Sequence, residues 1–260
     1  MRESTFGLGK SAAGAIAAIT IREGVRARLP LAWLCLLFGL AGLQSFLGAL
    51  ALIDAGDVVL SVSAPIARLL AVLVTAVFVI APLSRELGDG GADIMFAAPV
   101  PRAWWVLGRM AGHGTLAIGT AISVSLPLTL HAPAAAVLAW GTSLALESLL
   151  VAALAVLITI SLVRLPLALL ALLATYACAR MIGVIEMLGR ASDQTGWFDG
   201  FIHLLALVLP RLDLNAVTGW LLPGDAAVRA DVLLPGLAQT ALYGLIVIVA
   251  ASLDIERRRA

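Results

Sequence analysis

The feature that most limits how this chain can fold is a set of long apolar blocks. Leu29–Ile53 and Val232–Leu253 contain no charged residue, and a helix needs about 20 apolar residues to cross the hydrocarbon core of a bilayer. Over the whole chain, 62% of residues are hydrophobic and 13% are charged, against roughly half and a quarter in soluble domains. The sequence therefore predicts an all-α polytopic membrane protein, with residues 1–260 forming a single transmembrane domain.

Six spans are predicted, and polar or proline-containing turns separate them. The third and fourth spans form one apolar run, which Pro127, His131 and Pro133 divide where a tight turn is needed. A membrane β-barrel would alternate apolar and polar residues, whereas these blocks are apolar on all sides. The predicted spans are Leu29–Ile53, Pro65–Leu83, Ala103–Leu130, Pro133–Val163, Leu165–Leu188 and Val232–Leu253.

The distribution of Lys and Arg predicts the orientation of the spans. With these spans, 12 of the 17 basic residues collect on one side of the membrane, and only Arg190, Arg211 and Arg229 fall on the other. Because the cytoplasmic side carries the excess of Lys and Arg, both termini are expected to be cytoplasmic. The net charge of +1 gives no indication of nucleic-acid binding.

Residues 12–28 predict an amphipathic helix at the cytoplasmic interface. Ile16 and Ile19 supply apolar side chains and Arg22 and Arg26 supply charge, a composition typical of helices that lie in the interface plane. The alternative is that these arginines only anchor the first span through the positive-inside rule.

Residues 84–102 form the only sizeable cytoplasmic loop. It mixes charged and apolar side chains, which suits docking of a partner protein, although a solvated connector is the alternative. The candidate docking residues are Arg85, Glu86, Leu87, Asp89, Asp93, Ile94, Met95 and Phe96.

The outer segment 189–231 contains two apolar pieces, Phe201–Leu209 and Ala216–Leu222. Both are too short to span a bilayer. They are expected to be short re-entrant or interfacial helices between the fifth and sixth spans, separated by breaks at Pro210 and Pro223.

The loop and the entry to the third span together resemble the ABC-2 family of transporter permeases. Family members show Arg-Glu after the second span, then a Gly-containing turn, a short apolar stretch, Pro-Val-Ser-Arg and an aromatic-rich entry ending in Leu-Gly-Lys. Here Pro101 stands where Ser is usual, and Arg109 where Lys is usual. The matching residues are Ser84-Arg85-Glu86-Leu87-Gly88-Asp89-Gly90-Gly91-Ala92-Asp93-Ile94-Met95-Phe96-Ala97-Ala98-Pro99-Val100-Pro101-Arg102 and Trp104-Trp105-Val106-Leu107-Gly108-Arg109.

The resemblance implies a permease subunit in the bacterial inner membrane. Such a subunit pairs with a second copy or a homologous permease, and inserts its loop as a coupling helix into a cytoplasmic ABC ATPase dimer. The sequence has no Gly-x-x-x-x-Gly-Lys-Ser/Thr motif, so ATP and Mg are expected on the partner ATPase and no cofactor or metal on this chain. Export of a hydrophobic or amphiphilic substrate is the implied activity. An alternative within the family is transmission of ATP-driven motion to a periplasmic partner in metal-site or cytochrome assembly.

An intramembrane enzyme is the competing class of function. Ser143 and Glu147 are one helical turn apart, but their span has no His to complete a nucleophile and base arrangement. The sequence also lacks His-Glu-x-x-His. The chain is therefore not expected to be an enzyme.

Ionisable residues within the predicted spans are the remaining candidates. Glu147 lies near the middle of the fourth span, where it is expected either to line a pathway or to serve as a hydrogen-bonded packing residue. Arg68 is expected to pair locally with Asp54 or Asp57, and Arg180 with another helix.

His113 is expected to be a packing histidine, because no second His lies four residues away to complete a metal site. Trp33, Trp104 and Trp105 are expected to form an interfacial aromatic belt.

Overall fold

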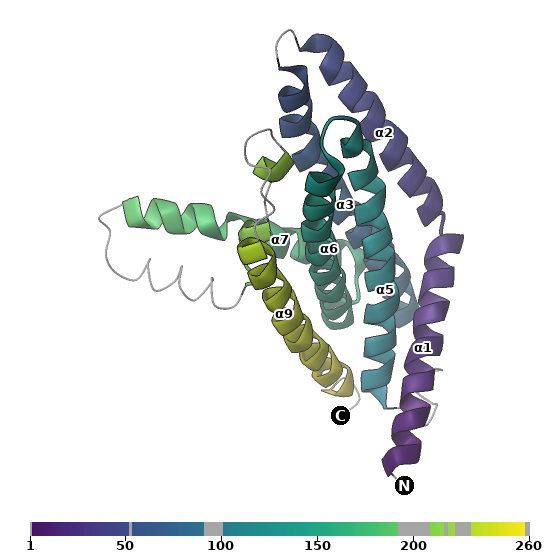
Figure 1. The fold of residues 1–260 in the computed structure, drawn as a ribbon. Helices are drawn as coiled ribbons and strands as arrows, with labels where there is room; N and C mark the ends of the chain where they lie inside the picture. Colours follow the sequence, from purple (N-terminus) through teal and green to yellow (C-terminus); the bar gives the residue numbers. More distant parts are fainter. Residues whose placement is uncertain are drawn as a thin grey trace.

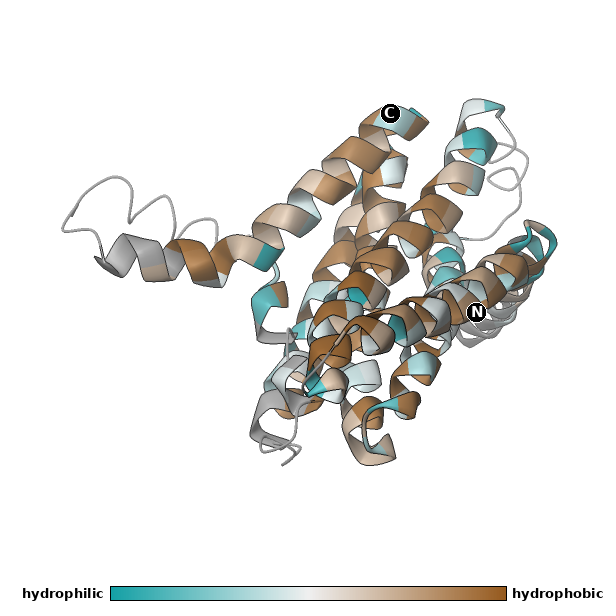
Figure 2. Ribbon diagram, turned by 90° about the horizontal axis from the view of Figure 1, so that it is seen from above, coloured by the Kyte–Doolittle hydropathy of each residue, from teal (hydrophilic) through white to brown (hydrophobic). Residues whose placement is uncertain are grey.

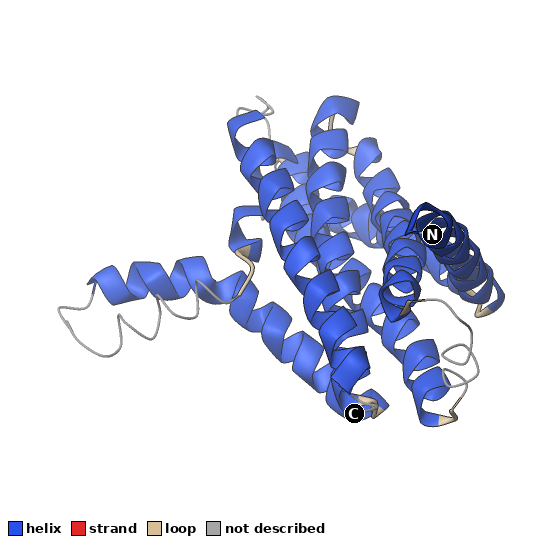
Figure 3. Ribbon diagram, turned by 90° about the horizontal axis from the view of Figure 1, so that it is seen from below, coloured by secondary structure: helices blue, strands red, loops and turns tan. Residues whose placement is uncertain are grey.

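The structure is a computed structural model that describes residues 2–51, 54–90, 101–191, 209–215, 218–221 and 230–257. Across these residues the chain is helical and contains no strand (Figures 1 and 3). The elements are α1 (Arg2–Arg26), α2 (Leu29–Leu50), α3 (Ala55–Gly88), α5 (Arg102–Ser125), η1 (Leu126–Leu130), α6 (Ala134–Leu162), α7 (Leu165–Ala191), η2 (Leu212–Asn215), η3 (Thr218–Leu221) and α9 (Ala230–Arg257).

The predicted class of fold is confirmed. Within the described part of the chain, six helices are long and apolar enough to cross a membrane, and apolar residues cover most of their length (Figure 2). The chain is therefore a polytopic helical membrane protein. The six helical segments are Leu29–Leu50, Ala55–Gly88, Arg102–Leu130, Ala134–Leu162, Leu165–Ile185 and Leu233–Arg257.

The second span begins ten residues before its predicted start at Pro65. Helix α3 runs continuously from Ala55 and contains both Pro65 and Pro82. A proline inside a helix removes one backbone hydrogen bond but does not end a membrane helix when neighbouring helices support it. Ala64 and Ala67 on this stretch are fully buried against other helices, which provides that support.

The corner between the third and fourth spans falls where the prolines predicted it. Helix α5 tightens into η1, which has Pro127 in its first turn, and α6 begins directly after Pro133. The first N–H groups of a helix have no partner within the helix, and proline lacks an N–H group, so Pro133 suits the start of α6. Helices α5 and α6, which follow one another across this corner, therefore pack as an antiparallel pair.

Helix α6 lies at the centre of the bundle, in contact with α3, α5, α7 and α9. Its core face carries mainly small and branched side chains, and Val151, Ala152, Ala155 and Val156 are each no more than 1% exposed. Helices α2 and α9 are peripheral and expose large apolar side chains over most of their length. Lipid is the medium that suits such surfaces.

Helix α1 packs along α5, and the two helices run in the same direction (Figure 1). Two glycines one turn apart on α5 make this close approach possible. A Cβ at Gly108 would come within 2.8 Å of the Ala13 carbonyl oxygen, and one at Gly112 within 2.9 Å of the Ala17 carbonyl oxygen. Small residues four apart are a common device for close packing of membrane helices.

Most of the predicted interfacial helix over residues 12–28 is part of the longer helix α1, which ends at Arg26 and has one side against the bundle. Ile16 packs against the core, whereas Ile19, Arg22 and Arg26 lie on the exposed side. The charged and buried faces are distinct, and the buried face contacts α5.

Helix α7 crosses behind α6, and its C-terminal end extends away from the other helices (Figure 1). In the outer segment the described residues include two short 3-10 turns, η2 and η3, which bury Leu212 and Leu221 in the bundle. Residues 192–208, 216–217 and 222–229, which include most of the predicted re-entrant pieces, lie outside the described residues.

Candidate functional site

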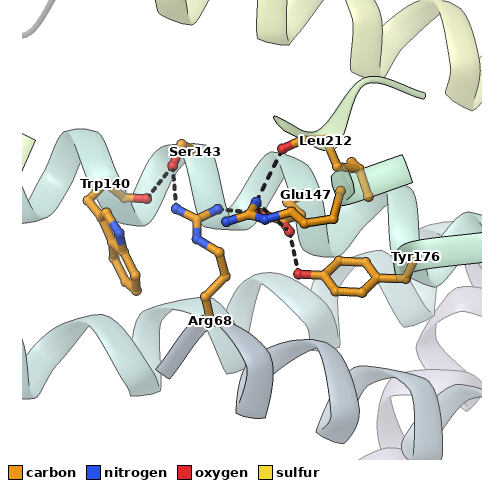
Figure 4. Close-up of polar contacts among 7 residues, drawn as sticks. Arg68, Trp140, Ser143, Glu147, Tyr176 and Leu212 are labelled. Carbon is orange, nitrogen blue, oxygen red and sulfur yellow. Dashed lines mark hydrogen bonds and ion pairs between the residues drawn. The ribbon is translucent and has the colours of Figure 1, made fainter. Parts of the chain in front are cut away.

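A cluster of polar side chains lies around Glu147, near the middle of α6 (Figure 4). Glu147 is fully buried, and its carboxylate is reached from α3 by Arg68 and from α7 by Tyr176 and Arg180. The backbone of Leu212 in η2 completes the group. We name these residues, together with Ser143 and Trp140, the Glu147 cluster.

Arg68 is enclosed on all sides by this cluster. One guanidinium nitrogen, Nη1, forms an ion pair with Glu147, and Nη2 donates to the Ser143 hydroxyl at 3.1 Å. The guanidinium carbon lies 5.0 Å from the centroid of the Trp140 ring, within the range of cation–π attraction. Arg68 therefore pairs across the bundle with Glu147, and not with Asp54 or Asp57 as the sequence suggested.

Helix α7 contributes two side chains to the cluster from one face. Tyr176 and Arg180 are four residues apart and so lie on the same side of the helix. The Tyr176 hydroxyl donates to Glu147 Oε1 at 2.8 Å, and Arg180 Nη1 lies 3.3 Å from the same oxygen. The same Arg180 nitrogen donates to the Leu212 carbonyl at 3.2 Å. Arg180 thus pairs with another helix, as expected.

Electrostatically, the Glu147 cluster contains two guanidinium groups and one carboxylate. Removing one partner from such a buried arrangement leaves an uncompensated charge, which costs about 3–5 kcal/mol. The contacts of Glu147 agree with its interpretation as a hydrogen-bonded packing residue, while a role in a pathway stays a hypothesis. The cluster joins α3, α6, α7 and η2 through polar contacts at the centre of the molecule.

A second polar centre lies around Arg109 of α5. Arg109 Nη1 lies 2.7 Å from Glu23 Oε2 of α1 and donates to the Thr20 hydroxyl at 3.1 Å. Its Nη2 forms an ion pair with Glu86 near the end of α3. The planar fork of an arginine suits this simultaneous contact with two carboxylates. We name Arg109, Glu23, Glu86 and Thr20 the Arg109 centre.

The described ends of the predicted docking loop are attached to the bundle. In the first part of the loop, Glu86 belongs to the Arg109 centre and Leu87 packs against the core, while Arg85 and Asp89 are exposed. At the last residue of the loop, Arg102 Nη1 donates to the Ile255 carbonyl near the end of α9 at 3.2 Å. The other candidate docking residues, Asp93, Ile94, Met95 and Phe96, lie outside the described residues.

His113 lies one helical turn beyond Arg109 and is buried. Neither ring nitrogen has a hydrogen-bond partner among the described residues. The ring borders a cavity of about 200 Å³ between α1, α3 and α5, where Glu23 and Arg85 supply charge and Phe78 an apolar wall. Buried polar groups normally find a partner in protein or ordered water, and this cavity has room for water.

Trp105 and Trp33 have specific partners that the aromatic-belt interpretation did not include. Trp105 is only 3% exposed, and the Arg109 guanidinium lies 5.7 Å from its ring centroid. Trp33 donates its indole N–H to the Thr120 hydroxyl at 3.0 Å. Trp33 therefore joins α2 to α5, whereas the contact between Trp105 and Arg109 lies within α5.

Candidates for enzyme or metal chemistry are few in the part of the chain that the structure describes. The Ser143 hydroxyl donates to the Trp140 carbonyl at 2.8 Å and accepts from Arg68. Within the described ranges, no group of three or more His, Cys, Asp or Glu residues is arranged to hold a metal ion.

In comparison with known proteins, the chain matches no protein-family model and no curated protein.

Proposed function

We propose that this chain is the membrane-spanning subunit of an ATP-driven ABC transporter of the ABC-2 type. A separate cytoplasmic ATPase dimer would supply energy, and a second copy of the chain or a homologous permease would complete the membrane part. The proposed activity is export of a hydrophobic or amphiphilic substrate across the bacterial inner membrane, with both termini cytoplasmic. The similarity of residues 84–109 to permeases of that family is the sequence basis for the proposal.

The observation that carries the proposal is the attachment of both ends of the docking loop to the bundle. Near the start of the loop, Glu86 is bound by Arg109, and at its end Arg102 is bound to the end of α9. In a coupling loop, both attachments would transmit movement of the partner to the helices.

The Arg109 centre gives that movement a route into the N-terminal helix. Arg109 holds Glu86 of α3 and Glu23 of α1 at the same time, so a displacement of the α3 end would also pull on α1. Charge-assisted hydrogen bonds of this kind are about twice as strong as neutral ones. Deeper in the bundle, the Glu147 cluster joins α3 to α6 and α7. A movement of α3 would thereby reach the centre of the molecule.

The proposal is tested by purifying the tagged chain in mild detergent from its native host. Mass spectrometry would identify co-purified proteins, and an ATPase assay would follow. We expect an ABC ATPase in stoichiometric amount. Arg85→Glu, which reverses the charge of an exposed loop residue, should remove it. Arg164→Glu is the matched control, because Arg164 is an exposed arginine between α6 and α7, and it should leave the ATPase bound.

Absence of any ATPase, even after gentle cross-linking, would reject the proposed class of function. Equal loss of the ATPase in Arg85→Glu and Arg164→Glu would reject the loop as the docking element.

A further inference from the structure

The positive charge around Glu147 exceeds the negative charge. Arg68 and Arg180 both contact the single carboxylate of Glu147. The neighbouring pair, Arg211 and Asp213, is neutral in sum, with 3.1 Å between Arg211 Nη2 and Asp213 Oδ2. Among the described residues of this region, one positive charge therefore has no matching carboxylate.

An excess charge near the centre of a membrane helix bundle is costly. Insertion measurements put a single Arg or Lys at mid-helix at about 2.5–3.5 kcal/mol, and a buried charge without a counter-ion is the unfavourable case for ion pairs. Glu147 lies near the middle of the 29-residue α6, far from both helix ends. An anion held at this site would remove the imbalance.

Access to the Glu147 cluster is possible from one direction. The side chains of Arg68 and Glu147 are 2% and 0% exposed, whereas that of Arg180 is 26% exposed. Among the described residues, the hydrogen bonds of Arg180 all use Nη1, so its guanidinium has further donors for another acceptor. An incoming anionic group would therefore meet Arg180 first.

The surroundings of Arg180 favour an anion that is attached to an apolar chain. Val184, four residues further along α7 and so on the same face, is 49% exposed, and the adjacent Met181 is 52% exposed. An inorganic anion would have to leave water to reach this depth. The headgroup of an amphiphile could approach along the apolar surface of the helix.

We propose that Arg180 binds the anionic group, a phosphate or a carboxylate, of an amphiphile. This inference rests on the proposed function, which it narrows from amphiphilic substrates in general to anionic ones. Arg180 provides the fork that binds such oxygens in pairs. Arg68 and Tyr176 hold Glu147 on the other side of the site. Arg180 is thus the substrate contact, and Arg68 is a positioning residue.

The test uses the purified full chain without any ATPase, in an uncharged detergent. Thermal unfolding is measured with a monoacylglycerol phosphate, with the neutral monoacylglycerol of the same chain length, and with inorganic phosphate alone. We expect the phosphorylated amphiphile to raise the midpoint by several degrees, because a ligand that binds only the folded state stabilises it. The neutral amphiphile and inorganic phosphate should leave the midpoint unchanged.

The variants locate the binding group. Arg180→Gln should abolish the shift, and Arg180→Lys should retain part of it because the charge remains. Arg22→Gln, which removes an exposed arginine of α1, should retain the full shift. Glu147→Gln increases the excess positive charge and should enlarge the shift, an effect that a purely structural role of Arg180 would not produce.

The same shift in Arg180→Gln as in the unmodified chain would overturn the proposal, as would equal shifts with the two monoacylglycerols. A full shift with inorganic phosphate alone would overturn the choice of an amphiphile. Because the assay contains no ATPase, its failure leaves the proposed function intact. If the co-purification experiment found no ATPase, a measured preference for the anionic amphiphile would still stand.

Discussion

Trp33 of α2 donates its indole N–H to the hydroxyl of Thr120 on α5, at 3.0 Å, across 87 positions of sequence. The same hydroxyl donates to the Leu116 carbonyl at 3.1 Å. Thr120 therefore accepts one hydrogen bond from Trp33 and donates another within α5. The Trp33 ring also lies over Gly119, where an added Cβ would come within 2.7 Å of ring carbon Cζ2. This contact fixes the start of the loosely packed first span against the bundle.

Trp33→Phe should destabilise the protein mildly. The ring keeps most of its apolar contact but loses its hydrogen bond to Thr120, and such bonds between membrane helices are worth about 0.6 kcal/mol on average and up to about 1.7 kcal/mol. Thermal or denaturant unfolding in detergent measures the change. Thr120→Val in the same background should add little, since the bond is already absent. A full additive loss in the double variant would contradict the bond.

Gly112→Ala should weaken the packing of α1 on α5. The new methyl group would lie within 2.9 Å of the Ala17 carbonyl oxygen and 2.6 Å of Thr20 Cβ, and overpacking of this kind costs about 1–3 kcal/mol. The comparison is Gly42→Ala in α2, where no atom lies within 4 Å of the added carbon. That change should be neutral or stabilising by up to about 1 kcal/mol. The unfolding midpoint should therefore fall in Gly112→Ala and stay the same or rise in Gly42→Ala.

Glu147→Gln should be strongly destabilising. It removes the only carboxylate from the described contacts of Arg68 and Arg180, and loss of one partner in a buried ion pair costs about 3–5 kcal/mol. Arg68→Met combined with Glu147→Gln should cost less than the sum of the two single changes. A double-mutant cycle on unfolding free energies measures that difference. Strict additivity would show that the two side chains do not interact.

If the chain works as proposed, Arg109→Lys should uncouple ATP hydrolysis from transport without releasing the proposed ATPase. The charge remains, but a lysine ammonium lacks the planar fork that reaches Glu23 and Glu86 together. Each lost hydrogen bond to a charged group contributes about 1.5–3 kcal/mol. ATPase co-purification should persist, while substrate-dependent ATP hydrolysis in proteoliposomes falls. Arg26→Lys, on the exposed side of α1, should behave like the unmodified chain.

Local sequence signals predicted the spans but not the partners of the buried charges. The uncharged blocks and the prolines at 127 and 133 identified the helices and the corner between the third and fourth spans. Periodicity says nothing about which helices become neighbours, so Arg68 was assigned to nearby aspartates although its partner lies 79 positions away. Depth in the fourth span was enough to single out Glu147.

The start of α3 and the role of Arg109 were missed for different physical reasons. Pro65 suggested a helix start, but tertiary packing of Ala64 and Ala67 supports the helix through it. Arg109 was noted only as a substitution for the usual Lys, because both of its carboxylate partners are distant in sequence. The Gly108 and Gly112 spacing was a signal for close packing of α5 that the sequence did contain.

The parallel packing of α1 on α5 has a consequence for how the chain is made. Helix α1 is synthesised before α5, and the face of α5 that receives it, along Gly108 and Gly112, follows only after α2, α3 and the loop. The order of synthesis and the order of docking are therefore different, and the N-terminal helix must wait beside an incomplete bundle. The ion pair between Glu23 and Arg109 can close only once α5 has been synthesised, which makes that pair a marker of an inserted third span.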